Sequence, residues 1–265
     1  MTELIQRQLD GHIATLTINR PETRNAISDP DVLESLLAAL DWIDSEQAVR
    51  VAILTGAGTA FSSGGNIKAI KSDIAYQGGA AGSRRFYRNT IQRLPERFER
   101  LEVPVIAAVN GPAYGVGCDL ACMCDLRIAS RSAVFAMSFV KLGLIPGDGG
   151  AFLLPRIVGH ARASEMTLTG EALDAETSLS IGLVSKVVDD DALMPEAHRM
   201  AALIAQNSPV AVRLARQLLR KCHGASLPHT LELSANYQAL AHASDDHKEA
   251  ISAFVEKRPA SFGGA

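Results

Sequence analysis

Apolar stretches of strand length alternate with helical patterns over the first 190 residues of the chain. Residues 12–19 alternate apolar and polar side chains, which predicts a strand with one exposed face. Residues 49–55 and 105–109 are almost entirely apolar, as expected of strands that are covered on both faces. Between the first two strands, Ser28-Asp29-Pro30 supplies a cap and a first-turn proline for a helix. This order of strand, helix and strand predicts a layered α/β core.

Mixed strand and helix patterns continue to about residue 190, and the pattern is helical beyond it. We expect a helix over residues 83–101 and two short strands at 127–129 and 133–135. Beyond Asp189, the sequence shows helical spacing of apolar residues and no strand pattern. The sequence therefore predicts an α/β core over residues 1–192 and a helical region over residues 193–265.

The composition excludes several classes of protein. Of the 265 residues, 47% are hydrophobic, and the net charge is −3, so neither disorder nor a strong general attraction to nucleic acid or anionic membranes is expected. Apolar windows stay shorter than the ~18 residues of a membrane-spanning helix, and residues 1–10 do not resemble a signal peptide. We expect a cytoplasmic protein. Neither the cysteine nor the histidine spacing indicates a metal site.

Two loops rich in small residues follow apolar strands and precede expected helices. They are Phe61–Lys68 and Asn110–Asp119. Small residues in such loops leave main-chain N–H groups free to point at a phosphate or an oxyanion. Neither loop has the glycine spacing of a dinucleotide site, and neither continues as the Gly-Lys-Ser/Thr of a P-loop. An anion site made of main-chain groups is the remaining functional interpretation.

These residues carry a resemblance to a known family. The run IAAVNGPAYGVGCDLA at residues 106–121, followed by CDLRIA at 124–129, resembles the central signature of the enoyl-CoA hydratase/isomerase (crotonase) superfamily. Further matches occur in the family's order along nearly the whole chain: NRP at 19–21, Asn25-Ala26, residues 61–68, LGLIP at 142–146, Gly149-Gly150, LTG at 168–170, GLV at 182–184 and FVEKR at 254–258.

The resemblance implies a fold, a ligand and an assembly. The fold would be an α/β spiral of ββα units with a helical C-terminal trimerisation region, and the assembly a homotrimer or a dimer of trimers. The substrate would be an acyl-CoA, with no separate cofactor. Its thioester oxygen would lie between the main-chain N–H groups of Gly65 and Val116. Residues implied in CoA binding are Arg24, Ala26, Gly65, Asn66, Ile67, Lys68, Phe254 and Lys257, and the last two would come from a neighbouring subunit.

The carboxylates decide which reaction such a site performs. Hydratases of this family use two glutamates, whose positions correspond here to Asp119 and Phe139, and a phenylalanine cannot move a proton. Isomerases need one carboxylate, and its position corresponds to Gly147, with Asp148 one residue later. The sequence therefore favours double-bond isomerisation slightly over hydration, with Asp148 and Asp119 as the catalytic candidates. A true hydratase and a non-catalytic CoA- or RNA-binding homologue are the alternatives.

Simpler structural explanations exist for the same residues. Asp148 would then be a turn residue between glycines, and Asp119 an acid near a helix N-terminus, where the helix dipole favours it. The arginines between residues 84 and 100 could bind a phosphate or a nucleic acid, but the interspersed glutamates favour a solvent-exposed helix.

Overall fold

Two β-sheets form the centre of the computed structural model, which describes residues 3–66 and 79–264. The larger sheet has the order β1-β2-β3-β4-β6-β9, and its strands are parallel except for the antiparallel edge strand β1. The smaller sheet has the order β5-β7-β8. The strands are β1 (Ile5–Asp10), β2 (Ile13–Ile18), β3 (Val51–Gly56), β4 (Val105–Val109), β5 (Ala113–Tyr114), β6 (Leu126–Ser130), β7 (Val134–Ala136), β8 (Ala172–Asp174) and β9 (Lys186–Val188).

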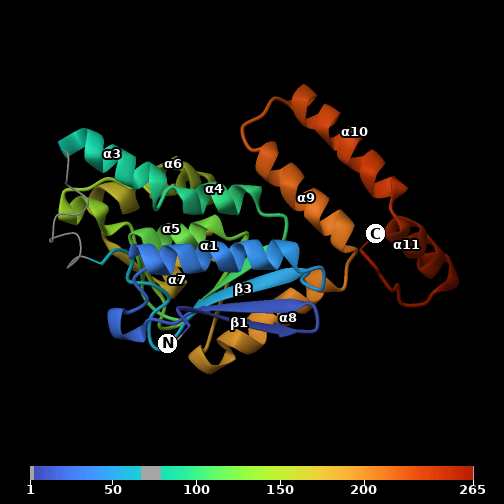
Figure 1. Cartoon of the computed structure of the whole chain (residues 1–265), viewed down its shortest axis with the longest axis horizontal. Coiled ribbons are helices and arrows are strands. Elements are labelled where there is room, and N and C mark those ends of the chain that lie inside the picture. Colours follow the sequence, from blue (N-terminus) through green and yellow to red (C-terminus); the bar gives the residue numbers. More distant parts are fainter. Residues whose placement is uncertain (1–2, 67–78, 265) are drawn as a thin grey trace.

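Helices cover both faces of the larger sheet and continue beyond it (Figure 1). They are α1 (Pro30–Ser45), α3 (Gly79–Asn89), α4 (Arg93–Arg100), α5 (Val116–Met123), α6 (Gly150–Thr169), α7 (Ala175–Ser180), α8 (Leu193–Ala205), α9 (Pro209–Lys221), α10 (Leu227–Ala243) and α11 (Asp245–Glu256). The described residues also contain the short 3-10 helices η1 (Pro21–Thr23), η3 (Ser138–Leu142) and η4 (Asp190–Ala192). Within the described residues, no helix is both long enough and apolar enough to cross a membrane.

Successive segments of the chain repeat one arrangement of two strands and a helix. In β4-β5-α5 and again in β6-β7-α6, the first strand joins the larger sheet, the second joins the smaller sheet, and a helix follows. Each repeat adds its strands beside those of the preceding repeat, because β4 pairs with β6 and β5 pairs with β7. The expected α/β spiral of ββα units is therefore confirmed.

The strands of the larger sheet divide their side chains between two apolar layers. In β3, Ala52 and Leu54 face the layer that contains α1, α4 and α5, whereas Val51 and Ile53 face the layer formed with α8. All six residues of β3 are buried. The apolar stretches at 49–55 and 105–109 thus correspond to strands covered on both faces, as the sequence predicts.

Two of the differences from the expectations have clear physical reasons. The helix expected over residues 83–101 is two helices, α3 and α4, separated by the turn at residues 90–92. Pro95 lies in the first turn of α4, where its missing N–H costs no helical hydrogen bond. The sequence pattern also missed β1, because only Ile5 of that edge strand is buried and the other positions carry no apolar alternation.

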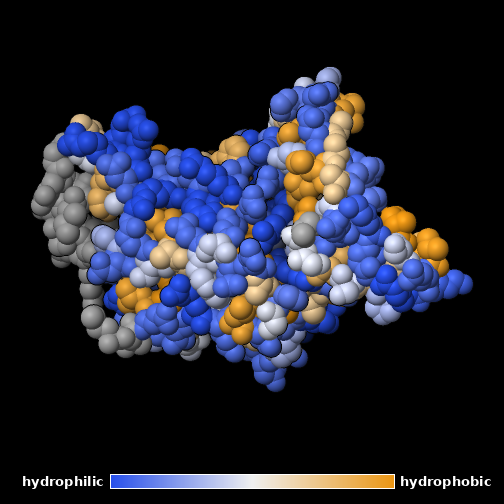
Figure 2. Space-filling model, turned by 45° about the vertical axis from the view of Figure 1, so that its right-hand side comes forward, coloured by the Kyte–Doolittle hydropathy of each residue, from blue (hydrophilic) through white to orange (hydrophobic). Residues whose placement is uncertain are grey.

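The last three helices extend away from the sheets (Figure 1). The helix α8 packs on the larger sheet, whereas α9, α10 and α11 form a protruding region after it. Large apolar side chains are exposed on this region, and Figure 2 shows apolar surface there. They are Leu219, Leu227, Leu231, Leu240, Ile251, Phe254 and Val255.

Candidate active site

The two loops singled out in the sequence lie against each other. Ser62 and Ala113 form a parallel β-bridge. The N–H of Tyr114 donates to the carbonyl of Ser62 at 3.0 Å, and the N–H of Ser62 donates to the carbonyl of Pro112 at 3.1 Å. Residues about fifty positions apart in the sequence therefore form one main-chain surface.

Two glycines make this close approach possible. A Cβ atom on Gly64, whose φ is +87°, would overlap the carbonyl oxygen of Tyr114 and approach the main-chain nitrogen of Val116. A Cβ atom on Gly117 would overlap the carbonyl oxygen of Ser62. Any side chain at either position would force the loops apart.

The N–H groups of Gly65 and Val116 are available at this junction. Val116 is the first residue of α5, and the first N–H groups of a helix have no acceptor within it. Across residues 3–66 and 79–264, neither N–H donates a hydrogen bond. The two groups come from the two loops that the bridge holds together. Such an arrangement can stabilise a developing negative charge without reorganising.

A third segment, residues 20–28, is fastened to the first loop. Arg24 and Asn25 both have left-handed backbone conformations, with φ of 54° and 59°. The buried Asn25 amide donates to the carbonyls of Ala57 at 2.8 Å and Ala60 at 2.7 Å. The hydroxyl of Ser62 donates to the carbonyl of Asn25 at 2.8 Å. This network fixes residues 20–28, which include the expected CoA-binding residues Arg24 and Ala26, relative to the first loop.

The remaining CoA-binding candidates on this side have different surroundings. Ala26 is buried, and Arg24 is exposed, with no carboxylate partner within the described parts of the chain. The main-chain N–H of Asn66 donates to the hydroxyl of Ser28 at 2.8 Å, and its amide donates to Asp29, which precedes α1. The candidates Ile67 and Lys68 lie outside the described residues.

The structure brings Asp119 and Asp148 together, although they are far apart in the sequence. Asp119 lies in the first turn of α5, and a Cβ atom on Gly150, the first residue of α6, would overlap its carboxylate. Asp148 precedes that helix by two residues and is 5% exposed. Within the described residues, neither Asp119 carboxylate oxygen makes a hydrogen bond of normal geometry, nor does Oδ1 of Asp148.

Burial shifts both carboxyl groups toward their neutral forms. It raises the pKa of Asp148 from 3.8 to about 6. It also raises the pKa of Asp119 well above 3.8, and Cys122 and the Asp148 charge add to this shift, whereas the Gly150 N–H opposes it. A pair of perturbed carboxyl groups beside N–H donors is typical of sites that move protons.

The loop that carries Asp148 is supported by residues that the sequence patterns did not indicate. The Gln92 side-chain amide donates to the carbonyl of Gly147 at 2.9 Å. A Cβ atom on Gly147 would lie 3.1 Å from the Tyr87 ring, and one on Gly149 would lie 3.1 Å from Pro95. These contacts come from α3, α4 and the turn between them. The helical spacing of apolar residues in the sequence does not predict such long-range contacts.

Phe139 lies next to the candidate donor Val116. Its ring is 3.7 Å from the position of a Cβ atom on Gly115, the residue that precedes Val116. The side chain belongs to the half-buried residues packed on the main core. An apolar ring therefore borders the donors at the position where the family resemblance implies a second hydratase glutamate.

Two CoA-binding candidates lie far from the others within one chain. Phe254 and Lys257 are at the end of α11, which lies at the opposite end of the molecule from α3 and the beginning of α1 (Figure 1). Phe254 is 84% exposed. The structure of a single chain does not bring these two residues to the candidate site.

The arginines between residues 84 and 100 divide into two groups. Arg93 pairs with Glu34, and Arg97 pairs with Asp41 at 2.6 Å and with Asp44 at 2.9 Å. Those two arginines join α4 to α1. The arginines of α3 and Arg100, the last residue of α4, are exposed. No group of three or more potential metal ligands from His, Cys, Asp and Glu occurs among the described residues.

Comparisons with known proteins agree with this geometry. The family model described as enoyl-CoA hydratase/isomerase matches residues 8–265. The chain is 38% identical to the 1,2-epoxyphenylacetyl-CoA isomerase of Escherichia coli over 266 residues, which cover 100% of both proteins. It is 38% identical to the short-chain-enoyl-CoA hydratase of Clostridium acetobutylicum over 253 residues, covering 94% of this chain and 93% of that protein.

Solved structures give the same result. A crystal structure of an enoyl-CoA hydratase from Bacillus anthracis superposes with a TM-score of 0.92 at 34% identity, covering 99% of this chain and 100% of the other. The matching sequences, the spiral of ββα units and the paired loops beside buried carboxyl groups point to the same conclusion. The chain is an enzyme that belongs to the enoyl-CoA hydratase/isomerase family.

Proposed function

We propose that this enzyme stabilises the enolate of an acyl-CoA thioester and shifts a carbon–carbon double bond. The observation that carries the proposal is the burial of Asp119 and Asp148 beside each other at the starts of α5 and α6. The N–H groups of Gly65 and Val116 would hold the thioester oxygen. Phe139 occupies the position of the second hydratase acid, which favours isomerisation over hydration.

The reaction needs one carboxylate that carries a proton between two carbon atoms. Ionised Asp148 would remove a proton from the α carbon of a 3-enoyl-CoA, and the electron pair would move into the thioester, giving a dienolate. The two N–H groups would stabilise its oxygen; losing one such donor typically costs ~10² to 10³ in rate. Protonated Asp148 would then return the proton to the γ carbon, giving a 2-enoyl-CoA. Atoms and electrons balance without a cofactor.

Hydration is the second candidate, because Asp119 provides another buried carboxyl group and a relative is named short-chain-enoyl-CoA hydratase. In that reaction, Asp119 and Asp148 would together hold and activate a water molecule. The side chain of Asp119 is one methylene shorter than the glutamate implied at this position. Comparing the rates with a 2-enoyl-CoA and a 3-enoyl-CoA separates the two candidates.

The CoA portion would be bound by the network around residues 20–28 and by a second copy of the chain. Exposed Arg24 provides a cation for a phosphate, and Ala26, Gly65 and Asn66 lie in the segments fastened beside the donors. We propose that Phe254 and Lys257 complete this site from a neighbouring subunit. The exposed apolar side chains of α9–α11 would be covered in the same homotrimer or dimer of trimers.

The decisive variant is Asp148→Asn, with Asp119→Asn as its matched partner. We expect Asp148→Asn to lower kcat for a 3-enoyl-CoA by ~10²- to 10⁴-fold, while the Kd for the acyl-CoA changes little. Asp119→Asn should retain most isomerisation if Asp148 alone carries the proton. An Asp148→Asn enzyme with unimpaired isomerisation would refute the proposal.

Light scattering coupled to size exclusion would test the trimer, and a monomer at micromolar concentration would contradict the assembly.

A further inference from the structure

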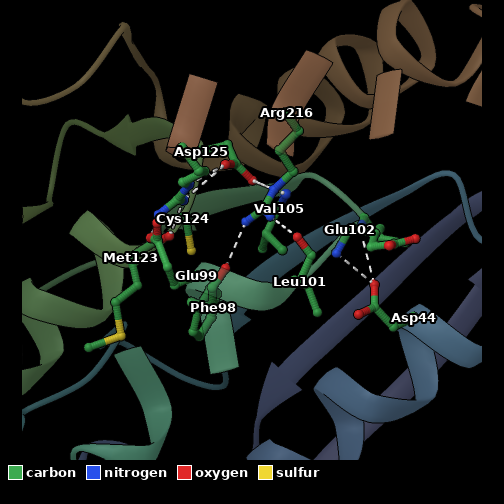
Figure 3. A network of polar contacts seen from close by, with 12 residues as sticks. Asp44, Phe98, Glu99, Leu101, Glu102, Val105, Met123, Cys124, Asp125 and Arg216 are labelled. Atoms are coloured by element: carbon green, nitrogen blue, oxygen red, sulfur yellow. Dashed lines mark hydrogen bonds and ion pairs between the residues drawn. The ribbon is translucent and has the colours of Figure 1, made fainter. Parts of the chain in front are cut away.

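A buried arginine of the C-terminal region joins the distal ends of two active-site helices (Figure 3). Arg216 of α9 is only 6% exposed. Its guanidinium donates to the carbonyl of Phe98 at 3.0 Å, to the carbonyl of Leu101, and to Oδ2 of Asp125 at 2.9 Å. Phe98 lies in the last turn of α4, and Asp125 follows α5 by two residues. One side chain therefore contacts the C-terminal ends of both helices.

Neighbouring groups complete the same network. Arg220, one turn later on α9, donates to the carbonyl of Met123 at 2.7 Å and to Oδ1 of Asp125 at 2.9 Å. The N–H of Val105, the first residue of β4, donates to Oδ2 of Asp125 at 2.8 Å. Asp125 thus connects α9 with the central sheet. We call Arg216, Arg220 and Asp125 the α9 clamp.

The clamp provides hydrogen-bond donors for helix-terminal carbonyl groups, which would cost free energy if they were buried without a partner. The last carbonyls of a helix have no partner within it, and a positive charge near that end interacts favourably with the helix dipole. Arg216 and Arg220 supply this charge to α4 and α5, respectively. A buried arginine in turn requires a carboxylate and several acceptors, which Asp125 and the helix carbonyls provide.

The opposite ends of the same two helices hold the catalytic candidates. The residue before α4 is Gln92, which binds the carbonyl of Gly147 next to Asp148. The first residue of α5 is Val116, whose N–H is one of the two donors. Each helix has eight residues and is thus about 12 Å long. A tilt at the clamped end would move Asp148 and the donor relative to each other.

We propose that Arg216 and Asp125 are positioning residues, which fix α4 and α5 so that the N–H of Val116 and the carboxylate of Asp148 meet the substrate together. This inference rests on the proposed enolate function. It implies that the C-terminal helical region contributes to the reaction rate through the clamp, without touching the substrate. A displacement of about 1 Å at a reacting group can cost ~10²-fold in rate.

The test compares Arg216→Met and Arg216→Lys with the control Arg50→Met. Arg50 is half-buried and, like Arg216, binds main-chain carbonyls, those of Ala205 at 3.1 Å and Phe262 at 2.7 Å in the C-terminal region. Within the described residues, none of its hydrogen bonds reaches α4 or α5. The probe is a 3-ketoacyl-CoA, because its enolate form absorbs in the near ultraviolet. The absorption band reports stabilisation of the enolate, and a competition assay reports total binding of the same compound.

We expect both Arg216 variants to lose the enolate band and about 10- to 100-fold in kcat, with KM changed less than about threefold. Lysine cannot replace arginine because its ammonium group cannot reach three acceptors in fork geometry. Arg50→Met should keep both the band and kcat, even if its thermal stability falls equally. Asp125→Asn should behave as the Arg216 variants do.

Three other outcomes would be decisive. Arg216 variants that keep the band and kcat would overturn the positioning role while leaving the proposed function intact. Equal losses in Arg216→Met and Arg50→Met at equal loss of stability would reduce the clamp to a purely structural element. If wild-type enzyme binds the probe without an enolate band, the proposed function fails at its first step. If Arg216→Met does not fold, Arg216→Lys provides the same comparison.

Discussion

Asp148 is held in an environment that disfavours its charged form. Burial raises its pKa from 3.8 to about 6. A difference of about two pH units corresponds to ~3 kcal/mol of less favourable ionisation in the folded protein. Asp148→Asn removes the ionisable group and keeps a side chain of nearly the same size. The variant should therefore alter activity and stability in opposite directions.

The activity should follow the ionised form of Asp148. As the proposed base, the carboxylate is competent only after it loses its proton, so kcat/KM for a 3-enoyl-CoA should rise as the pH passes through about 6 and then level off. In Asp148→Asn we expect kcat to fall by ~10²- to 10⁴-fold, the usual contribution of a positioned base. The residual activity should lose this pH dependence.

The stability should change with the opposite sign. The folded protein keeps the Asp148 proton up to about pH 6, whereas the unfolded chain releases it near pH 3.8. Between these values the folded state binds more protons, so rising pH lowers the free energy of unfolding. Above pH 6 the free energy of unfolding of the wild type is lowered by the full cost of ionising the buried Asp148. Asp148→Asn should then be more stable than wild type by up to ~3 kcal/mol at pH 7.5, and nearly equal to it at pH 4.

Urea denaturation at pH 4 and pH 7.5, at one fixed protein concentration, measures this difference. Asp174→Asn is the control, because hydrogen bonds from Thr177 lower the pKa of Asp174. The stabilisation due to the Asp174 charge is present above the ordinary pKa and is lost as the pH falls. If Asp148→Asn gains no stability between pH 4 and pH 7.5, the buried-charge argument is wrong. If the wild-type activity has no inflection near pH 6, Asp148 is not the base.

Three further substitutions test the other parts of the site. Gly64→Ala would place a Cβ atom against the carbonyl of Tyr114, so we expect kcat to drop by ~10² or more, measured by steady-state kinetics; an unchanged rate would contradict the need for close approach. Phe139→Glu should raise the ratio of hydrated to isomerised product, determined by chromatography of the acyl-CoA products, and an unchanged ratio would argue against the role given to position 139. Asn25→Ala leaves the buried carbonyl of Ala60 without its donor, so the free energy of unfolding should fall by ~1 to 3 kcal/mol in urea titrations; a change below 0.5 kcal/mol would show that the amide network is dispensable.

Local patterns predicted the buried central strands and the start of the first long helix. The strand β4 coincides with the apolar stretch at 105–109, and α1 begins at Pro30, although Asp29 before it makes no side-chain capping hydrogen bond. These elements are predictable because burial on both faces of a strand and a first-turn proline leave a mark on consecutive residues. The edge strand β1 lacks such a mark, since five of its six residues are exposed.

The candidate site was predictable in its parts but not in its arrangement. The glycine-rich loops and the acids at 119 and 148 can be recognised one by one. Their proximity depends on the packing of α5 against α6 and on the Ser62–Ala113 bridge, which join distant parts of the chain. The support given by Gln92 and by the α9 clamp depends on side chains that look like ordinary surface polar residues in the sequence.

Because the candidate donors are main-chain groups, their positions and the side chains that border them can change independently. The positions of the Gly65 and Val116 N–H groups depend on the backbone path through Gly64 and Gly117, not on the side chain at 116. Side chains that border the donors, such as Phe139, can therefore be exchanged without rebuilding the anion site. If the proposed function holds, a library that varies the bordering positions and keeps these two glycines should yield new acyl-CoA reactions on one unchanged backbone.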